Sequence, residues 1–121
     1  MIKKVLRADL LDKRITDIVG QHIYFLHKPE EIKTDLYIEY ETISGYYDDF
    51  AGDLHMSRNY KIQVDIFSKG NYGKIQEIIE KVLEEKDYIL VSIVDLYESD
   101  ISLFHCALKF NKKILERKEW F

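Results

Sequence analysis

The sequence of 121 residues contains one cysteine, Cys106, and one proline, Pro29. No disulfide can form within the chain, and a reducing, cytosolic setting fits this composition. A single proline leaves little material for rigid linkers, so we expect residues 1–121 to form one domain. No basic segment followed by an apolar run marks a signal peptide, and no run approaches the roughly 20 apolar residues that span a bilayer. We therefore expect no membrane partner.

An excess of positive charge is also missing. The chain has 18 Lys and Arg residues against 22 Asp and Glu residues, a formal net charge of −4. This balance argues against specific nucleic-acid binding, because affinity for phosphates comes largely from basic side chains. Basic residues do gather near both ends, for which solvated termini are the ordinary explanation. Nine tyrosines, six phenylalanines and one tryptophan argue against disorder.

Motifs of catalysis and of metal binding are lacking as well. None of the four histidines has the spacing of metal ligands; they are His22, His27, His55 and His105. There is no Cys-x-x-Cys, no His-Glu-x-x-His and no glycine-rich phosphate loop. Cys106 follows His105, but neighbours on a strand point to opposite faces, so we expect a buried, inert cysteine. The sequence thus predicts no catalytic residue, no cofactor and no metal ion.

What is present is a clear strand between residues 58 and 68, with a period of two. One face is formed by Tyr60, Ile62, Val64 and Ile66, and the other by Lys61, Gln63, Asp65 and Phe67. Asp65, with Gln63 beside it, is a candidate interaction residue on the polar face. Two interpretations stay open: a polar site or subunit contact, or simply the solvated side of the sheet with Asp65 paired to Lys61.

Two amphipathic helical regions flank a set of strands. Residues 2–19 predict a helix that bends or divides at Asp12, a potential N-cap, and stops at Gly20. Residues 72–86 predict a second helix, with Asn71 as N-cap. Its apolar stripe consists of Ile75, Ile78, Ile79, Val82 and Leu83.

The remaining strands are expected at residues 22–26, 36–43, 88–96 and 101–110. In the last of these, the face that carries Phe104 is expected to be buried, and residues 111–121 form a tail that is helix or coil. The order is α-β-β-β-α-β-β. It predicts an α+β fold: a mainly antiparallel β-sheet of about five strands, with an N-terminal helix and one central helix packed on one face.

The segment 44–57 is the least regular and is expected to be a long, flexible loop. Candidate interaction residues there are Tyr46, Tyr47, Asp48, Asp49, Phe50 and Leu54. A long loop with apolar side chains is often a binding loop. The alternatives are a loop folded back over the core and an extended hairpin arm. The aspartates do not have the spacing of a calcium-binding EF-hand, so a solvated acidic loop is expected.

A family resemblance rests on a series of segments. These are Ile18-Val19-Gly20, His22-Ile23-Tyr24, the loop with Pro29, Leu36-Tyr37-Ile38-Glu39-Tyr40, and above all Gln63-Val64-Asp65-Ile66-Phe67-Ser68. The series resembles the tail completion proteins of long-tailed bacteriophages and prophages, relatives of the tail terminator and tail-to-head joining proteins. The resemblance covers roughly residues 5–110.

The resemblance implies a structural protein of virion assembly and not an enzyme. It implies a homo-oligomeric, hexameric ring that caps the tail tube protein, ends tube growth and joins the head connector protein. Such a protein would lie in the host bacterial cytoplasm during assembly and then in the tail or neck of the virion. By this resemblance, segment 44–57 matches a long loop that would meet the tube or a neighbouring subunit, and the strand of Gln63 and Asp65 matches the sheet that builds the domain and the ring.

The residues themselves are compatible with a ring. A closed ring needs a heterologous contact between two different patches, and exposed aromatic side chains suit such patches. Tyr46, Tyr47 and Phe50, with Trp120 and Phe121 at the end of the chain, are the aromatic candidates. Two other hypotheses remain: a small ligand-binding or regulatory module with the tyrosine-rich segment as a lid, and an enzyme that uses Asp65 or His105.

Overall fold

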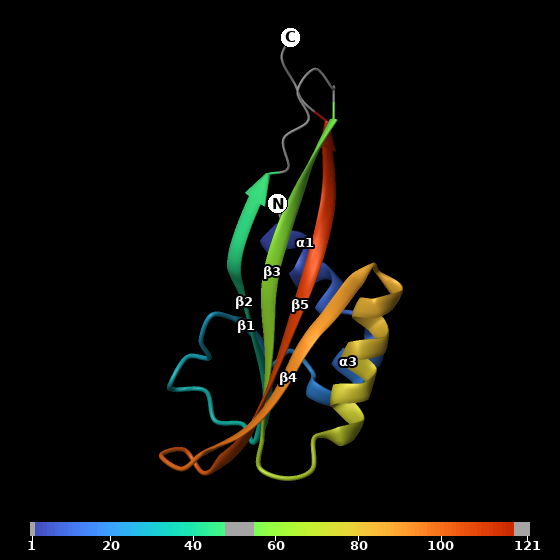
Figure 1. Ribbon diagram of the computed structural model, residues 1–121. Helices are drawn as coiled ribbons and strands as arrows, with labels where there is room; N and C mark the ends of the chain where they lie inside the picture. Colours follow the sequence, from blue (N-terminus) through green and yellow to red (C-terminus); the bar gives the residue numbers. More distant parts are fainter. Residues whose placement is uncertain (1, 48–54, 118–121) are drawn as a thin grey trace.

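The computed structural model describes residues 2–47 and 55–117 (Figure 1). Within this part of the chain the elements are α1 (Ile2–Leu10), α2 (Lys13–Val19), β1 (Ile23–Phe25), β2 (Leu36–Tyr47), β3 (His55–Ser68), α3 (Gly73–Glu85), β4 (Tyr88–Glu98) and β5 (Leu103–Arg117). None of these helices is long and apolar enough to cross a membrane.

The strands form one sheet in the order β1-β2-β3-β5-β4. β1 pairs with β2 in parallel, and all other pairs are antiparallel. The prediction of a mainly antiparallel α+β sheet with helices on one face is therefore confirmed. α3 connects β3 to β4, but these two strands are not neighbours, because β5 lies between them.

The helices cover one face of the sheet, and the main core lies between the two layers (Figure 1). From β3 the core takes Tyr60, Ile62, Val64 and Ile66, all 6% exposed or less. The predicted stripe of α3 supplies Ile75, Ile79, Val82 and Leu83, all buried. The buried face of β3, with a period of two, thus packs against the apolar stripe of α3, with a period of 3.6, as the sequence predicts.

The two N-terminal helices divide where the sequence predicts a bend. Asp12 is the N-cap of α2, and its side chain accepts a hydrogen bond from the backbone N–H of Arg14. Gly20 ends α2 with φ +62°, a left-handed conformation that favours glycine. The chain can therefore turn directly into β1.

Four predicted boundaries were wrong. Residues 44–47 continue β2 and residues 55–57 begin β3, so the strands run well into the segment expected to be a loop. Residues 111–117 extend β5 and are neither helix nor coil. The N-cap position of α3 is Tyr72, although Asn71 Oδ1 still accepts a hydrogen bond from the Gly73 N–H. Pairing between β3 and β5 along fourteen positions explains the longer strands, because hydrogen bonding to a partner overrides weak local propensity.

Candidate functional site

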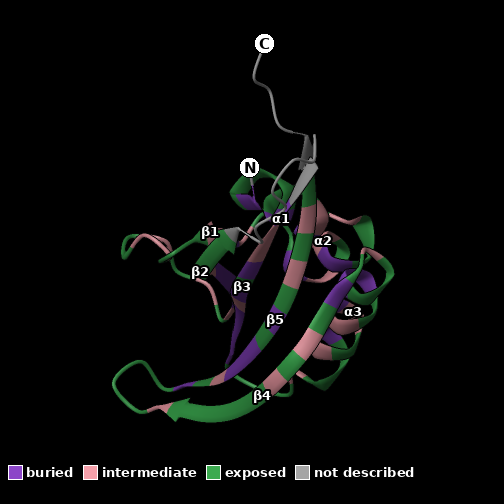
Figure 2. Ribbon diagram, turned by 45° about the horizontal axis from the view of Figure 1, so that its top comes forward, coloured by how far each residue is buried: buried purple, intermediate pink, exposed green. Residues whose placement is uncertain are grey.

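The outer strand β4 is the most unusual surface of the described chain. It pairs only with β5, so its other edge has no partner strand among residues 2–47 and 55–117. Its exposed apolar side chains are Ile89, Val91, Ile93, Val94, Leu96 and Tyr97, which are 42–66% exposed. Figure 2 shows this strand mostly in the colours of partly and fully exposed residues. A long apolar edge strand is normally avoided, because it associates with other chains.

A break in the register explains why β4 is apolar on both faces. The pairing with β5 shifts between Leu90 and Ser92. Before the shift, Tyr88 and Leu90 pack against the main core. After it, Val94 pairs with Ala107 and Leu96 with His105, on the face opposite the helices. That face has no helix over it, so these side chains stay exposed.

A compact polar cluster lies on the same face. His105 Nε2 is 2.7 Å from Asp65 Oδ1, and His105 Nδ1 is 2.9 Å from Glu98 Oε1. Asp65 Oδ1 also accepts a hydrogen bond of 2.8 Å from Gln63 Nε2. The cluster joins β3, β4 and β5, and the Asp65 side chain in its centre is only 9% exposed.

Aromatic rings shield this cluster from water. The imidazole of His105 stacks on Phe67 at 4.2 Å between ring centroids, and Phe67 stacks on Tyr37 at 4.8 Å. Tyr37, Phe67 and Leu103 form a second, small core on the open face, with Tyr24 packed against it. The sequence left this face open between a polar site or subunit contact and a solvated surface, and tertiary packing places a small apolar core beside the polar cluster.

The protonation of His105 follows from its partners. Burial lowers the pKa of the imidazole, but the hydrogen bonds to Asp65 and Glu98 outweigh burial, and the net shift is upward. Ionised carboxylates only accept hydrogen bonds, so a His105 bonded to both must donate from both nitrogens. The upward shift of the pKa and the two carboxylate partners favour the imidazolium form of His105, which suits a structural tie between strands.

A second carboxylate, Glu39, lies on β2 directly opposite Asp65. Burial raises its pKa, while a 2.7 Å hydrogen bond from the backbone N–H of Lys28 and the nearby His27 partly offset that effect. The side chain is 9% exposed. Within the described residues, no group of three or more His, Cys, Asp or Glu side chains is arranged to hold a metal ion.

The structure separates the predicted interaction residues into two groups. Gln63 and Asp65 come together in the polar cluster, and the expected partner of Asp65, Lys61, is replaced by His105. The interpretation of Asp65 as part of a solvated face was therefore wrong. Tyr46 lies on the distal part of β2 and is 57% exposed, and the backbone of Tyr47 continues that strand. The other predicted residues of this segment, Asp48, Asp49, Phe50 and Leu54, lie outside the described residues.

The expectation for Cys106 holds. The residue is fully buried, and burial raises the pKa of its thiol to about 12. The face of β5 on which it lies is buried at Cys106, Leu108 and Phe110, although Phe104 itself is 41% exposed. Such a thiol is protonated at neutral pH and is a poor nucleophile.

The apolar edge of β4 was missed at the level of sequence. Its run Tyr88-Ile89-Leu90-Val91-Ser92-Ile93-Val94 looks like a strand covered on both faces. A signal was nevertheless present: a sheet with helices on one side needs only one apolar face per strand, and this strand has two. A strand with two apolar faces is therefore unexpected at the edge of such a sheet.

Comparisons with known proteins add one finding on the fold. No family model matches the chain, and no curated protein matches it. Among solved structures, the chain is similar to one from the "Virion of native gene transfer agent (GTA) particle". The TM-score is 0.57 at 10% sequence identity, and the match covers 92% of each chain. At this identity the similarity concerns the fold, over nearly the whole length of both chains.

Proposed function

We propose that this chain is a structural protein of a phage-like particle, and more specifically a tail completion protein. In this role, six copies form a ring that caps the tail tube, ends its growth and joins the head connector. The observation that carries the proposal is the exposed apolar edge of β4. The sequence resemblance and the shared fold with a chain of a gene transfer agent virion support it.

The edge of β4 explains how such a ring could hold together without a chemical step. Along the eleven residues of β4, about every second residue directs its backbone N–H and C=O towards the open edge, and apolar side chains lie above and below it. Association removes these side chains from water, at about 25 cal/mol for each Å² of apolar surface. A patch that meets a different patch on the next copy generates a ring if the rotation closes. We therefore propose that the protein acts by assembly and is not an enzyme.

Electron microscopy of the purified protein, mixed with tail tubes of the same particle, tests this function. We expect rings at tube ends and a tube length that no longer increases once the protein is added. Tubes that keep growing with bare ends would contradict the proposal. A chain that stays monomeric and melts at higher temperature with a metabolite would support the ligand-binding hypothesis instead.

A further inference from the structure

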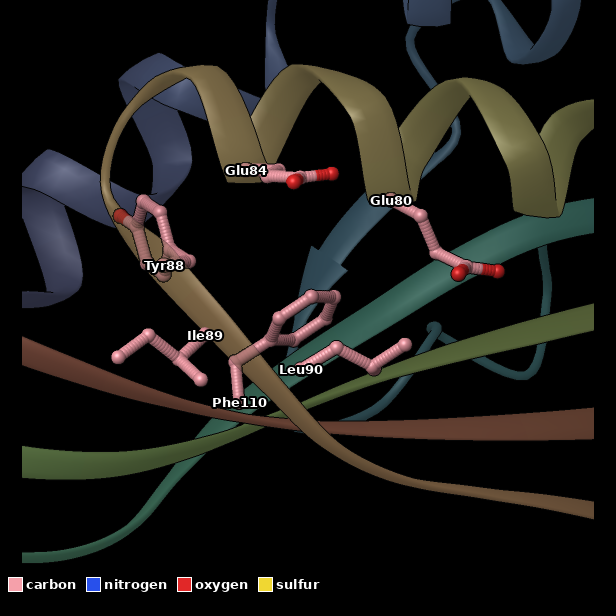
Figure 3. A pocket seen from close by; sticks show the side chains of 6 residues that line it. All are labelled: Glu80, Glu84, Tyr88, Ile89, Leu90 and Phe110. Atoms are coloured by element: carbon pink, nitrogen blue, oxygen red, sulfur yellow. The ribbon is translucent and has the colours of Figure 1, made fainter.

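A groove beside β4 has a composition that specifies an occupant. It lies between α3 and β4, has a volume of about 310 Å³, and is lined by Glu80, Glu84, Tyr88, Ile89, Leu90 and Phe110. Figure 3 shows both glutamates projecting from α3 towards β4, above the ring of Phe110. An apolar floor under an acidic rim fits a long basic side chain, which buries its methylene stem and keeps its charge at the rim.

The glutamates are placed at a cost to the helix. Glu80 and Glu84 are four residues apart on α3, and like charges at this spacing destabilise a helix by a few tenths of a kcal/mol. Glu80 accepts a hydrogen bond from Gln76, and Glu84 is exposed. A cation between the two carboxylates would remove their repulsion.

The same chain carries a basic surface elsewhere. We call the distal parts of three strands the arm: residues 44–47 of β2, 55–61 of β3 and 111–117 of β5 (Figure 1). The arm contains five Lys or Arg residues and one Glu, although the whole chain has a net charge of −4. A hollow of about 360 Å³ at its base includes Tyr46, Lys61, Asn111 and Lys113, with Asp87 at one side.

Register places Lys61 and Lys113 on the opposite side of the sheet from the groove, whereas Arg58 and Lys112 lie on the helix side, where Lys112 Nζ is 4.8 Å from the ring centroid of Tyr88. Lys61 pairs with Asn111 across β3 and β5, and Lys113 is two residues further along β5. Both lysines are exposed and lie on the same face as Gln63 and Asp65, away from the helices. The acidic groove is on the helix side. Lys61 and Lys113 therefore face away from the acidic groove and carry the opposite charge, although Ile89 lines both the groove and the hollow at the base of the arm.

We infer that the groove between α3 and β4 binds a lysine of the arm of a second copy of this chain. This contact rests on the proposed ring. It makes the ring interface heterologous, since each copy offers a groove on one side and an arm on the other. Charge complementarity sets the register between copies, and the apolar edge of β4 supplies the contact area next to it.

A charge-swap experiment tests the inference. The variants are Glu80→Lys with Glu84→Lys, Lys61→Glu with Lys113→Glu, and all four substitutions together. Each pair reverses one surface, and the fourfold variant restores attraction with the signs exchanged. Glu30→Lys with Glu31→Lys is the matched control, because it changes the net charge equally at two exposed residues outside the groove. Ring yield is measured by native mass spectrometry and by counting capped tubes, and thermal unfolding verifies the fold.

We expect each reversed pair to lower ring yield at least about tenfold, and the fourfold variant to recover most of it. The control should form rings like the wild type. Should a reversed pair lose its fold, the milder Glu80→Gln with Glu84→Gln replaces it, with a smaller loss expected.

Normal rings in both reversed pairs would overturn the inference and leave the proposed function intact. Rings that form but no longer cap tubes would also overturn it, and would assign the groove to the tube protein. A wild-type chain that forms no ring, alone or on tubes, would instead remove the proposed function.

Discussion

The two edges of the sheet are built in opposite ways. β1 is three residues long, and the side chains of α1 lie against it: Arg7 Nη1 donates to the carbonyl of Ile23, and Lys3 Nζ lies 5.0 Å from the ring centroid of Phe25. β4 is eleven residues long, and apolar side chains along it are 42–66% exposed. Short, charged and covered edges are how proteins prevent association. One edge is closed against association, and the other is left available for it.

The largest effect is expected when β4 receives charged side chains like those of α1 that lie against β1. We expect Val94→Lys with Leu96→Lys to lower ring yield by about 100-fold or more, because two apolar side chains can no longer be buried between copies. Analytical ultracentrifugation and electron microscopy with tubes measure the loss. Leu26→Lys, next to β1 and 56% exposed, is the control and should assemble normally. Equal losses in both would mean that the two edges do not differ in function.

A second change separates stability from assembly. Asp65→Asn removes one of the two carboxylates that hold the buried His105, and we expect unfolding to cost about 2 kcal/mol less. Urea titration measures this change. Glu41→Gln is the control: it removes a carboxylate of β2 on the same face of the sheet, opposite Gln63. Its free energy of unfolding should stay within about 0.5 kcal/mol of the wild type. If Asp65→Asn kept full stability but lost ring assembly, the polar cluster would belong to the interface.

A smaller effect is expected where the chain enters β1. Gly20→Ala forces a side chain into φ +62°, so we expect a loss of about 1 kcal/mol in stability and faster amide exchange in β1. Gly70→Ala is the matched control, since a Cβ there meets no atom within 4 Å and φ is not positive. Unchanged exchange in β1 for Gly20→Ala would show that this turn does not position the closed edge.

The smallest effect concerns pH. The pKa of His105 is raised above 6.5 in the folded protein, so its contribution to stability is complete below that value and is lost as pH rises through the folded pKa. The raised pKa of Glu39 acts in the same direction above pH 4.5. We expect a melting temperature a few degrees lower at pH 8.5 than at pH 6, measured by calorimetry. His105→Gln should flatten this profile, and a profile that it leaves unchanged would contradict the role of the imidazolium.

The local sequence pattern was sufficient to predict the helices and strands and the face of β3 that packs on the helices. The alternation at Tyr60, Ile62 and Val64 predicts the core side of β3, and the stripe of α3 predicts what packs on it. Asp12 and Gly20 predict the limits of α2, because caps act through residues close in sequence. The ends of β2 and β5 were not predictable in this way, since their pairing partners are far along the chain.

The candidate site was less accessible from sequence. The sequence singles out Gln63 and Asp65 as candidates, but their partner His105 is 40 residues from Asp65 and adjacent to it only through the pairing of β3 with β5. The exposure of β4 depends on sheet order, which places β5 inside and β4 outside. The apolar strand β4 therefore lies at the edge, although its sequence is typical of a strand inside a sheet.

By itself, the sequence determined that this chain forms an α+β domain, where α2 begins and ends, and which side of β3 packs against the helices, because these properties depend on neighbours within a few residues. The tertiary structure alone decided that β4 is an edge, that His105 lies between two carboxylates, and that Lys61 and Lys113 face away from the acidic groove. These properties depend on which strands pair, and pairing joins residues that are far apart along the chain.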